Sequence, residues 1–255
     1  MLDKDRLALI SSMVYERQGV KTSTVAKELG ITNPTARKYL DHLASSDSRI
    51  ERVHGGASLS PARYPSGETE LYKSRASVHR TEKVEIAHKA LGHVSDRDTI
   101  MVDSSTTCFE FARLLLDTKL RLTVITSGIR TAQLLSENDN ITVIIVGGVL
   151  YRQSNTIIDE FDCRIYERFN IDTFFFSASC VSIDCGFSEY NLREIDKKRE
   201  CIGRASNSIA LIDSSKLEKK TSSTFAELPD VSLLITDGKI DPKIKAAYEK
   251  RVTVE

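Results

Sequence analysis

Residues 1–60 carry apolar side chains at the three- and four-residue spacing of amphipathic helices. The spacing predicts a helix over residues 4–17 and a second helix that Thr22 or Ser23 caps and Gly30 ends. A third helix follows, with Thr32 as the expected N-cap. Three short helices with a tight turn between the last two indicate a helix-turn-helix.

The third predicted helix has a polar face opposite its apolar one. Ala36, Leu40 and Leu43 share the inward face. The outward face carries Arg37 and Lys38, whose side chains can reach guanine edges or phosphates. The candidate DNA-binding residues here are Thr32, Asn33, Pro34, Thr35, Arg37, Lys38 and His42. An ordinary solvated helix face is the alternative interpretation.

A short basic strand is expected after the third helix. Residues 50–53 have strand character, Ser45–Ser48 is a modest turn signal before them, and His54, Gly55 and Gly56 allow a sharp exit. Arg52 and His54 are further DNA-binding candidates, although His54 taken alone is better explained as a structural turn residue. We therefore predict a winged helix-turn-helix over residues 1–57 and a linker over residues 58–72, which hold two prolines and few large apolar residues.

Apolar runs of strand length alternate with helical ones after the linker. A helix is expected over residues 73–93. The strand candidates that follow are 100–102, 122–125, 141–146, 173–176, 209–212 and 233–235. The later helix candidates are 108–116, 129–135, 193–205 and 242–248. This alternation predicts an α/β domain over residues 73–255, built around a mostly parallel sheet.

Ligands of such sheets bind beyond the carboxyl ends of the strands. The first predicted strand runs into Asp103, Ser104, Ser105, Thr106 and Thr107, which open a helix. Hydroxyls and free helix N–H groups there suit a phosphate, and Asp103 could hold sugar hydroxyls. Helix capping is the alternative role for these hydroxyls.

Polar and glycine-rich segments follow the later strands as well. Glycines permit a close backbone approach, and a lysine after a strand end can contact a phosphate or hydroxyl. These segments add the effector-binding candidates Thr126, Ser127, Gly147, Gly148, Arg152 and Lys216. A surface arginine and a solvated turn are the alternatives for Arg152 and Lys216.

Composition narrows the class of protein. The chain is 40% hydrophobic and 28% charged, lacks tryptophan, and its apolar runs are too short to span a membrane. The start, M-L-D-K-D-R, does not read as a signal peptide. Five cysteines without C-x-x-C pairing argue against disulfides and a zinc site, so we expect a cytoplasmic protein with no metal and no cofactor. The net charge is 0, which neither supports nor excludes a local basic DNA-binding face.

Several segments resemble the DeoR family of bacterial sugar-metabolism repressors. Residues 31–40 are similar to the family's V-S-x-x-T-I-R-R-D-L, and residues 50–57 to its L-x-R-x-H-G-G-A. The second domain contains D-S-S-T-T, L-T-V-I-T-S, G-G and D-S-S-K, and Glu194 precedes Lys197 and Lys198 as in the family. The resemblance implies a sensor domain with a fold like those of ribose-phosphate isomerases and CoA transferases, which binds phosphorylated sugars, and it adds Glu194 to the effector-binding candidates.

Two functions follow from these observations. The first is a transcriptional repressor of carbohydrate utilisation, which binds double-stranded operator DNA as a homodimer or homotetramer and responds to a phosphorylated sugar. The second is a sugar-phosphate isomerase-like enzyme with an accessory DNA-binding head, using Asp103, Glu194 and Lys216 as acid–base groups. Neither a phosphate-binding G-x-x-x-x-G-K-[ST] nor a G-x-G-x-x-G occurs, which argues against a nucleotide-dependent protein.

Overall fold

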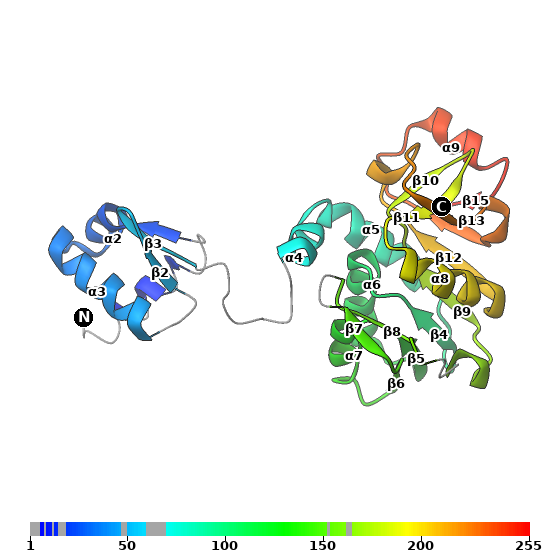
Figure 1. Ribbon diagram of the computed structural model, residues 1–255, viewed down its shortest axis with the longest axis horizontal. Coiled ribbons are helices and arrows are strands. Elements are labelled where there is room, and N and C mark those ends of the chain that lie inside the picture. Colours follow the sequence, from blue (N-terminus) through cyan, green and yellow to red (C-terminus); the bar gives the residue numbers. More distant parts are fainter. Residues whose placement is uncertain are drawn as a thin grey trace. The chain divides into compact units, whose positions relative to one another are not determined.

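The computed structural model describes residues 6, 7, 9–11, 13, 14, 19–46, 50–59, 70–151, 154–161 and 165–255 (Figure 1). The chain forms two compact units, Met1–Ser66 and Gly67–Glu255. The predicted linker at 58–72 overlaps a strand of the first unit at one end and a helix of the second at the other.

The N-terminal unit contains a helix-turn-helix and a small antiparallel sheet. The described residues between 6 and 14 are helical, and the rest of the helix predicted at 4–17 lies outside the described residues. The further elements are β1 (Gly19–Lys21), α2 (Thr22–Leu29), α3 (Asn33–Ser46), β2 (Ile50–Val53) and β3 (Gly56–Leu59). The strands pair in the order β1-β3-β2, and helices and sheet enclose one apolar core.

Two of the predicted helix signals have different outcomes. The expected side-chain cap of α2 is wrong, because the N-cap position is Lys21 and neither Thr22 nor Ser23 caps the helix with its side chain. The N–H of Thr22 instead donates to the carbonyl of Gly55, 2.8 Å away, which joins α2 to the wing. The N-cap predicted at Thr32 is confirmed, since its hydroxyl accepts from the N–H of Thr35 at 3.4 Å.

The wing is a β-hairpin whose turn follows β2. His54 and Gly55 make the turn, and Gly55 has φ 84°, a left-handed conformation that glycine adopts without steric cost. The turn predicted at Ser45–Ser48 lies partly outside the described residues, and the hairpin turn between the paired strands β2 and β3 is the one at His54 and Gly55.

The second unit is built on one parallel seven-stranded sheet, in the order β15-β14-β12-β9-β4-β5-β6. Its strands are β4 (Thr99–Val102), β5 (Leu122–Thr126), β6 (Ile141–Ile145), β9 (Thr173–Phe176), β12 (Asn207–Leu211), β14 (Leu233–Ile235) and β15 (Thr253–Val254). The predicted strands are thus confirmed, with small differences at their ends.

Helices cover both faces of this sheet (Figure 1). One face packs against α5 (Arg80–Leu91), α6 (Thr106–Leu116) and α7 (Ile129–Leu135). The other packs against α8 (Leu192–Arg204), α9 (Pro242–Tyr248) and a small sheet, β10-β11-β13. Strand residues alternate between the two cores, so Ile100 and Val102 point to one and Met101 to the other.

The remaining elements were not predicted from periodicity because they are short. They are β7 (Val149–Tyr151), β8 (Thr156–Ile158), β10 (Cys180–Ser182), β11 (Gly186–Glu189), β13 (Ser223–Ala226) and three 3-10 turns at Ile165–Arg168, Ser214–Lys216 and Leu228–Asp230. Phe187 of β11 and Phe225 of β13 pack edge-on against Phe176 of β9.

The single helix expected over residues 73–93 is wrong. The chain forms α4 (Glu70–Ser77) and then α5, with a break at Val78 and His79. His79 has φ 54°, a left-handed conformation that a continuous α-helix cannot contain. The apolar spacing alone gave no sign of this break.

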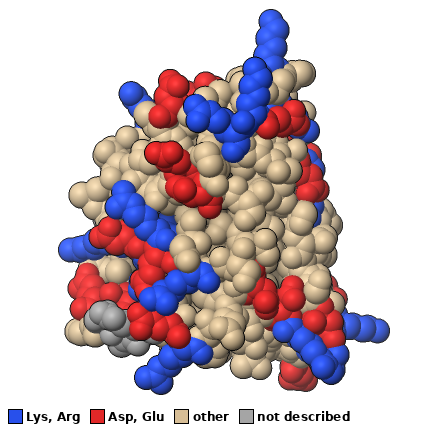
Figure 2. Space-filling view, turned by 90° about the vertical axis from the view of Figure 1, so that its right-hand side faces the viewer, with Lys and Arg blue, Asp and Glu red and all other residues tan. Residues whose placement is uncertain are grey.

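The surface of the second unit mixes both signs of charge. Figure 2 shows acidic and basic side chains interspersed around the edge of one face, with uncharged surface through its middle. This agrees with 36 basic and 36 acidic residues in the whole chain. Among the described residues, no helix is long and apolar enough to cross a membrane.

Candidate functional site

The outer face of α3 has the exposure predicted for a DNA-reading helix. Ala36, Leu40 and Leu43 are buried in the core of the N-terminal unit. The predicted contact residues of α3 and its N-terminus are exposed, apart from the half-buried Thr35: Thr32, Asn33, Pro34, Arg37, Lys38 and His42. The face therefore offers two cations and several hydrogen-bonding groups to a partner.

The two wing candidates differ in their surroundings. His54 is exposed at the hairpin turn. Arg52 forms an ion pair with Asp41 of α3, with 2.7 Å between Nε and Oδ1, and its guanidinium also donates to the carbonyl of Gly56. Arg52 thus connects the wing to α3, a structural role that the sequence gave no reason to expect.

The second unit has a cavity of about 900 Å³ at the carboxyl ends of its strands. It lies where the strand order reverses, since the chain proceeds from β4 to β5 and β6 on one side and from β9 to β12 and β14 on the other. Asp103 follows β4 and Ser177 follows β9, and the N–H of Ser177 donates to Oδ2 of Asp103 at 2.9 Å. The cavity therefore occupies the place at which open parallel sheets bind ligands.

Six of the predicted effector residues line this cavity. They are Asp103, Ser104, Ser105, Thr106, Glu194 and Lys216. Ser105 is the N-cap of α6, with its Oγ accepting from the N–H of Cys108 at 3.1 Å. The N-terminal end of α6, with its positive partial charge, therefore faces the cavity.

Asp103 has a structural role that was not anticipated. Its Oδ1 accepts from the N–H of Ser105 at 2.8 Å, and its Oδ2 accepts from Ser177 and lies 3.7 Å from Nζ of Lys198. Oδ2 thus joins the loop after β4 to the loop after β9, while Oδ1 orders the turn that Asp103 and Ser105 share. The predicted role of Asp103 in holding sugar hydroxyls stays a prediction, because a carboxylate has further lone pairs to accept with.

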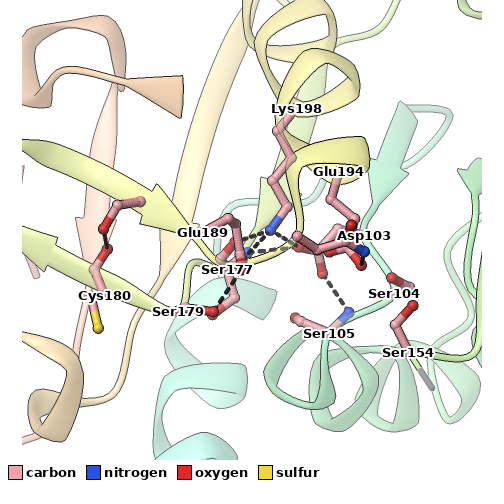
Figure 3. A network of polar contacts seen from close by, with 12 residues as sticks. Asp103, Ser104, Ser105, Ser154, Ser177, Ser179, Cys180, Glu189, Glu194 and Lys198 are labelled. Atoms are coloured by element: carbon pink, nitrogen blue, oxygen red, sulfur yellow. Dashed lines mark hydrogen bonds and ion pairs between the residues drawn. The ribbon is translucent and has the colours of Figure 1, made fainter. Parts of the chain in front are cut away.

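A buried lysine stands at the centre of the polar network drawn in Figure 3. Nζ of Lys198 donates to Oε1 of Glu189 at 2.8 Å and to the carbonyl of Ser177 at 2.7 Å. Oε2 of Glu189 accepts from the hydroxyl of Ser179 at 2.5 Å. The network joins α8, β11 and the loop after β9, and fixes the floor of the cavity.

The pKa shifts in this network follow from burial and from the neighbouring charges. Burial opposes the charged form of Glu189, but attraction and hydrogen bonding from Lys198 outweigh it and lower the pKa of that carboxyl. Burial likewise opposes the Lys198 ammonium, and the carboxylates of Glu189, Asp103 and Glu194 outweigh it and raise the pKa of the amine. Burial raises the pKa of Glu194. Lys198 and Glu189 are therefore a charged pair.

Two further lysines reach the cavity from other elements. Nζ of Lys216 lies 3.0 Å from the hydroxyl of Ser177 and 3.6 Å from Oδ2 of Asp213. Lys83 of α5 is 4% exposed, and burial and the nearby Lys216 ammonium lower its pKa to about 8. These amines give one side of the cavity a positive character.

The other predicted effector residues that the structure describes do not line the cavity. Thr107 is fully buried in α6, and its hydroxyl has no hydrogen-bond partner among the described residues. Oγ1 of Thr126 accepts from the N–H of Gly128, and the carbonyl of Ser127 accepts from Ile157.

Close packing against β8 explains why a glycine stands at position 148 after β6. Gly148 has φ 144°, and a Cβ there would lie 2.1 Å from the carbonyl oxygen of Ile158 in β8. Gly147 precedes it in the same connection, outside the cavity lining. Arg152 lies outside the described residues. The structure thus brings together the residues after β4, those on α8 and Lys216, but not those after β5 and β6.

Several polar cavity residues were absent from the predicted site, among them Lys83, Ser154, Ser177, Glu189 and Lys198. Ser177 follows a predicted strand, a position that could have identified it. Lys198 lies four residues after Glu194 and therefore on the same face of α8. Glu189 ends the unpredicted β11, and Lys83 and Ser154 lie on elements whose orientation the sequence does not reveal.

A helix-turn-helix with a wing, followed by an α/β unit with a polar cavity, defines a DNA-binding transcriptional regulator with a separate sensor domain. Comparison with known families agrees with this class. Residues 6–61 match the DeoR-like helix-turn-helix domain, and residues 78–238 match the DeoR C terminal sensor domain. The chain belongs to the DeoR family of transcriptional regulators.

Similar proteins match along nearly the whole chain. The uncharacterized HTH-type transcriptional regulator YulB of Bacillus subtilis is 33% identical, over 100% of this chain and 96% of that protein. GolR of Listeria innocua is 31% identical, over 98% and 95%. The glycerol-3-phosphate regulon repressor of Haemophilus influenzae is 27% identical, over 89% and 86%.

Comparison with solved structures found partial matches. A ribose 5-phosphate isomerase A from Methanocaldococcus jannaschii superimposes with a TM-score of 0.40 and 17% identity, covering 53% of each chain. Similarity at this level does not bear on the activity of this chain.

Proposed function

We propose that this protein is a repressor of a carbohydrate-utilisation operon and that a phosphorylated sugar bound in the cavity controls its affinity for operator DNA. The relatives include a glycerol-3-phosphate regulon repressor and a lactose phosphotransferase system repressor, and both names refer to phosphorylated or phosphorylation-coupled substrates. The observation that carries the proposal is the charge distribution in the cavity.

The phosphate group binds on the side of the cavity formed by α6, Lys83 and Lys216. The first N–H groups of a helix have no partner within the helix, and the helix dipole favours an anion there. The hydroxyl of Ser105 and the two amines supply further donors to a phosphate. Lys198 is already neutralised by Glu189 and Asp103 and contributes to the framework only.

The sugar hydroxyls bind on the opposite side, near α8. Glu194 lines the cavity there, with Oε1 accepting from Nδ2 of Asn191 at 2.8 Å, and its second oxygen can accept from a sugar hydroxyl. Oγ of Ser154 also lines the cavity, and it is buried without a hydrogen-bond partner among the described residues. Because an unsatisfied buried hydroxyl costs free energy, a ligand hydroxyl beside Ser154 is favoured.

A thermal-shift screen of the full-length protein tests this proposal. The panel contains phosphorylated sugars, the corresponding free sugars and inorganic phosphate. We expect stabilisation by at least one phosphorylated sugar, none by the free sugars, and loss of the shift in Lys216→Ala. Stabilisation by free sugars alone, or by no compound of the panel, would contradict it.

The absence of enzymatic turnover is also part of the proposal. An isomerase-like activity is the alternative, because the cavity brings carboxyl groups of Asp103, Glu189 and Glu194 together around Lys198. Both oxygens of Asp103 accept hydrogen bonds and Glu189 is paired with Lys198, so Glu194 is the carboxyl group of the three that an isomerase would use as its general base. Incubation of a stabilising sugar phosphate with the protein, followed by NMR of the sugar, decides between the two; conversion to an isomer would favour the enzyme.

A further inference from the structure

Cavity residues hold the C-terminal end of α4. Nζ of Lys83 donates to the carbonyl of Val78 at 2.8 Å and also to the carbonyl of Arg75. The hydroxyl of Thr106 donates to the same Arg75 carbonyl at 3.4 Å. Lys83 and Thr106 both line the cavity, and both are more than nine-tenths buried. The end of α4 is therefore attached to the wall of the ligand cavity.

This attachment replaces the hydrogen bonds that a continuous helix would make. The last carbonyls of a helix have no partner within it. Because His79 is left-handed, α5 starts in a new direction and cannot supply those partners. The Lys83 ammonium serves as the C-cap of α4, from the first turn of the following helix.

One donor of Lys83 remains available to a ligand. An ammonium group has three N–H donors, and the described contacts use two of them, both to carbonyls. Among the described residues Lys83 has no ion pair with a carboxylate; the charged groups that influence it are Lys216, Asp213, Arg75 and Glu110. A buried ammonium with an unused donor at the wall of the cavity favours an anionic ligand.

We propose that Lys83 is the positioning residue that couples occupancy of the cavity to α4: it donates to the ligand's anionic group and to the α4 carbonyls at once, so that binding of a phosphorylated sugar rigidifies the α4–α5 junction. The inference rests on the proposed function of the cavity. In the chain, α4 is the first described element after the wing of the DNA-binding unit. Ordering of α4 by the effector therefore changes the segment that connects sensing to DNA reading.

Hydrogen exchange of the full-length protein tests this coupling. Inorganic phosphate and three phosphorylated sugars (ribose 5-phosphate, glucose 6-phosphate and fructose 6-phosphate) serve as probes, with potassium chloride at equal ionic strength as the reference. Two segments are followed: residues 103–109, which report ligand at α6, and residues 74–83, which report the junction. We expect both segments to exchange more slowly with the probe that binds, the junction by about fivefold, as expected for one added hydrogen bond.

Lys83→Met is the informative variant, since it keeps the length and apolar stem of the side chain and removes the donors. It should lose the slowing at residues 74–83 and keep part of the protection at residues 103–109, where Lys216 still binds. Lys89→Met is the matched control, because Lys89 lies on the same helix and donates to a carbonyl at 2.7 Å, that of Thr236, away from α4. If Lys83→Met does not fold, Lys83→Gln replaces it; this side chain is uncharged and shorter, so it cannot hold the junction carbonyls and the ligand at once and should show the same loss.

The outcomes separate this inference from the proposed function. Slower exchange at 103–109 with unchanged exchange at 74–83 would overturn the coupling and leave the ligand site intact. Slowing at 74–83 that persists in Lys83→Met would overturn it too. Exchange at 103–109 that no probe changes would remove the ligand site itself, and the coupling with it.

Discussion

Nζ of Lys198 lies 2.8 Å from Oε1 of Glu189 and 3.7 Å from Oδ2 of Asp103, and all three side chains are close to 90% buried. A buried ion pair typically stabilises the folded state no more than a well-packed pair of apolar side chains would. Removing only one partner is nevertheless strongly destabilising, because the other charge is then left buried without its counterion. Lys198, held by Glu189, contacts Asp103 after β4 and the carbonyl of Ser177 after β9, and so positions the two loops that form the floor of the cavity.

Removing one partner of this pair should therefore destabilise the second unit strongly. For Glu189→Ala we expect a loss of about 3–5 kcal/mol in the free energy of unfolding, because a buried ammonium is left with one more distant carboxylate. Urea unfolding followed by circular dichroism measures it. The control is Asp196→Ala, which removes an exposed partner of Arg199 on the same helix and should cost under about 1 kcal/mol. Equal losses in the two variants would show that the buried pair has no special role.

The outer face of α3 should carry the specificity of DNA binding. Arg37→Ala and Lys38→Ala should each weaken binding to a selected duplex by about 1–3 kcal/mol for a base contact, with folding unchanged, because both side chains are exposed and outside the core. Fluorescence anisotropy against duplexes enriched from a random pool measures the change. Lys243→Ala, an exposed lysine of α9, is the control. Full affinity in both α3 variants would rule out this face as the reading surface.

The ion pair between Arg52 and Asp41 should limit how strongly the wing binds DNA. In Asp41→Asn the acidic charge beside the reading face is removed and the Arg52 guanidinium is released. We expect tighter binding to unselected DNA and a salt dependence steeper by about one counterion, because one more cation can contact a phosphate. Titrations at several salt concentrations test this; an unchanged slope would mean that Arg52 stays bound to α3 or already contacts DNA.

Ligand binding should depend on the charge of Lys83. Its pKa is lowered to about 8, chiefly by burial and then by Lys216. Affinity for a phosphorylated sugar should fall by about tenfold between pH 7 and pH 9, most of it above pH 8, as the amine loses its proton, while the phosphate stays mostly dianionic over this range. Calorimetric titration at pH 7, 8 and 9 measures it, and Lys83→Met should show no such fall.

The lowered pKa of Lys83 also predicts how the stability of the ligand-free protein depends on pH. Whereas ligand affinity should fall as the pH rises, the contribution of Lys83 to stability should increase. The folded-state pKa of about 8 lies below the ordinary value of 10.5, so between these pH values the unfolded chain binds more protons than the folded one. The contribution of Lys83 to the free energy of unfolding therefore rises with pH from about 8 to about 10.5. The measurement is the free energy of unfolding of the wild type and of Lys83→Met at several pH values between about 8 and about 10.5. If the difference between the two proteins does not change with pH, the Lys83 amine is not in the buried environment assigned to it.

Much of this architecture could be predicted from the sequence because the signals are local. Strands such as 173–176 are continuous apolar runs, and the N-cap at Thr32 is set by residues within one helical turn. The break at His79 could not be predicted, since it depends on how α5 packs on the sheet. The outward face of α3 followed directly from its periodicity.

Part of the candidate site could likewise be predicted from local sequence signals, and part could not. Residues 103–106 and Lys216 follow predicted strand ends, and a parallel sheet places those ends at one edge. Gly147 and Gly148 also follow a strand, yet they serve the close packing of β8. Lys83 and Glu189 reach the cavity through tertiary packing, and no local pattern in the sequence marks them.

The most direct test of the account is the affinity for selected duplex DNA, measured by anisotropy with and without a phosphorylated sugar that stabilises the protein. We predict that a saturating concentration changes the dissociation constant at least tenfold in the wild type and not in Lys216→Ala, whose affinity without ligand stays normal. An affinity that is the same with and without the bound sugar phosphate would contradict the claim that this cavity controls DNA binding.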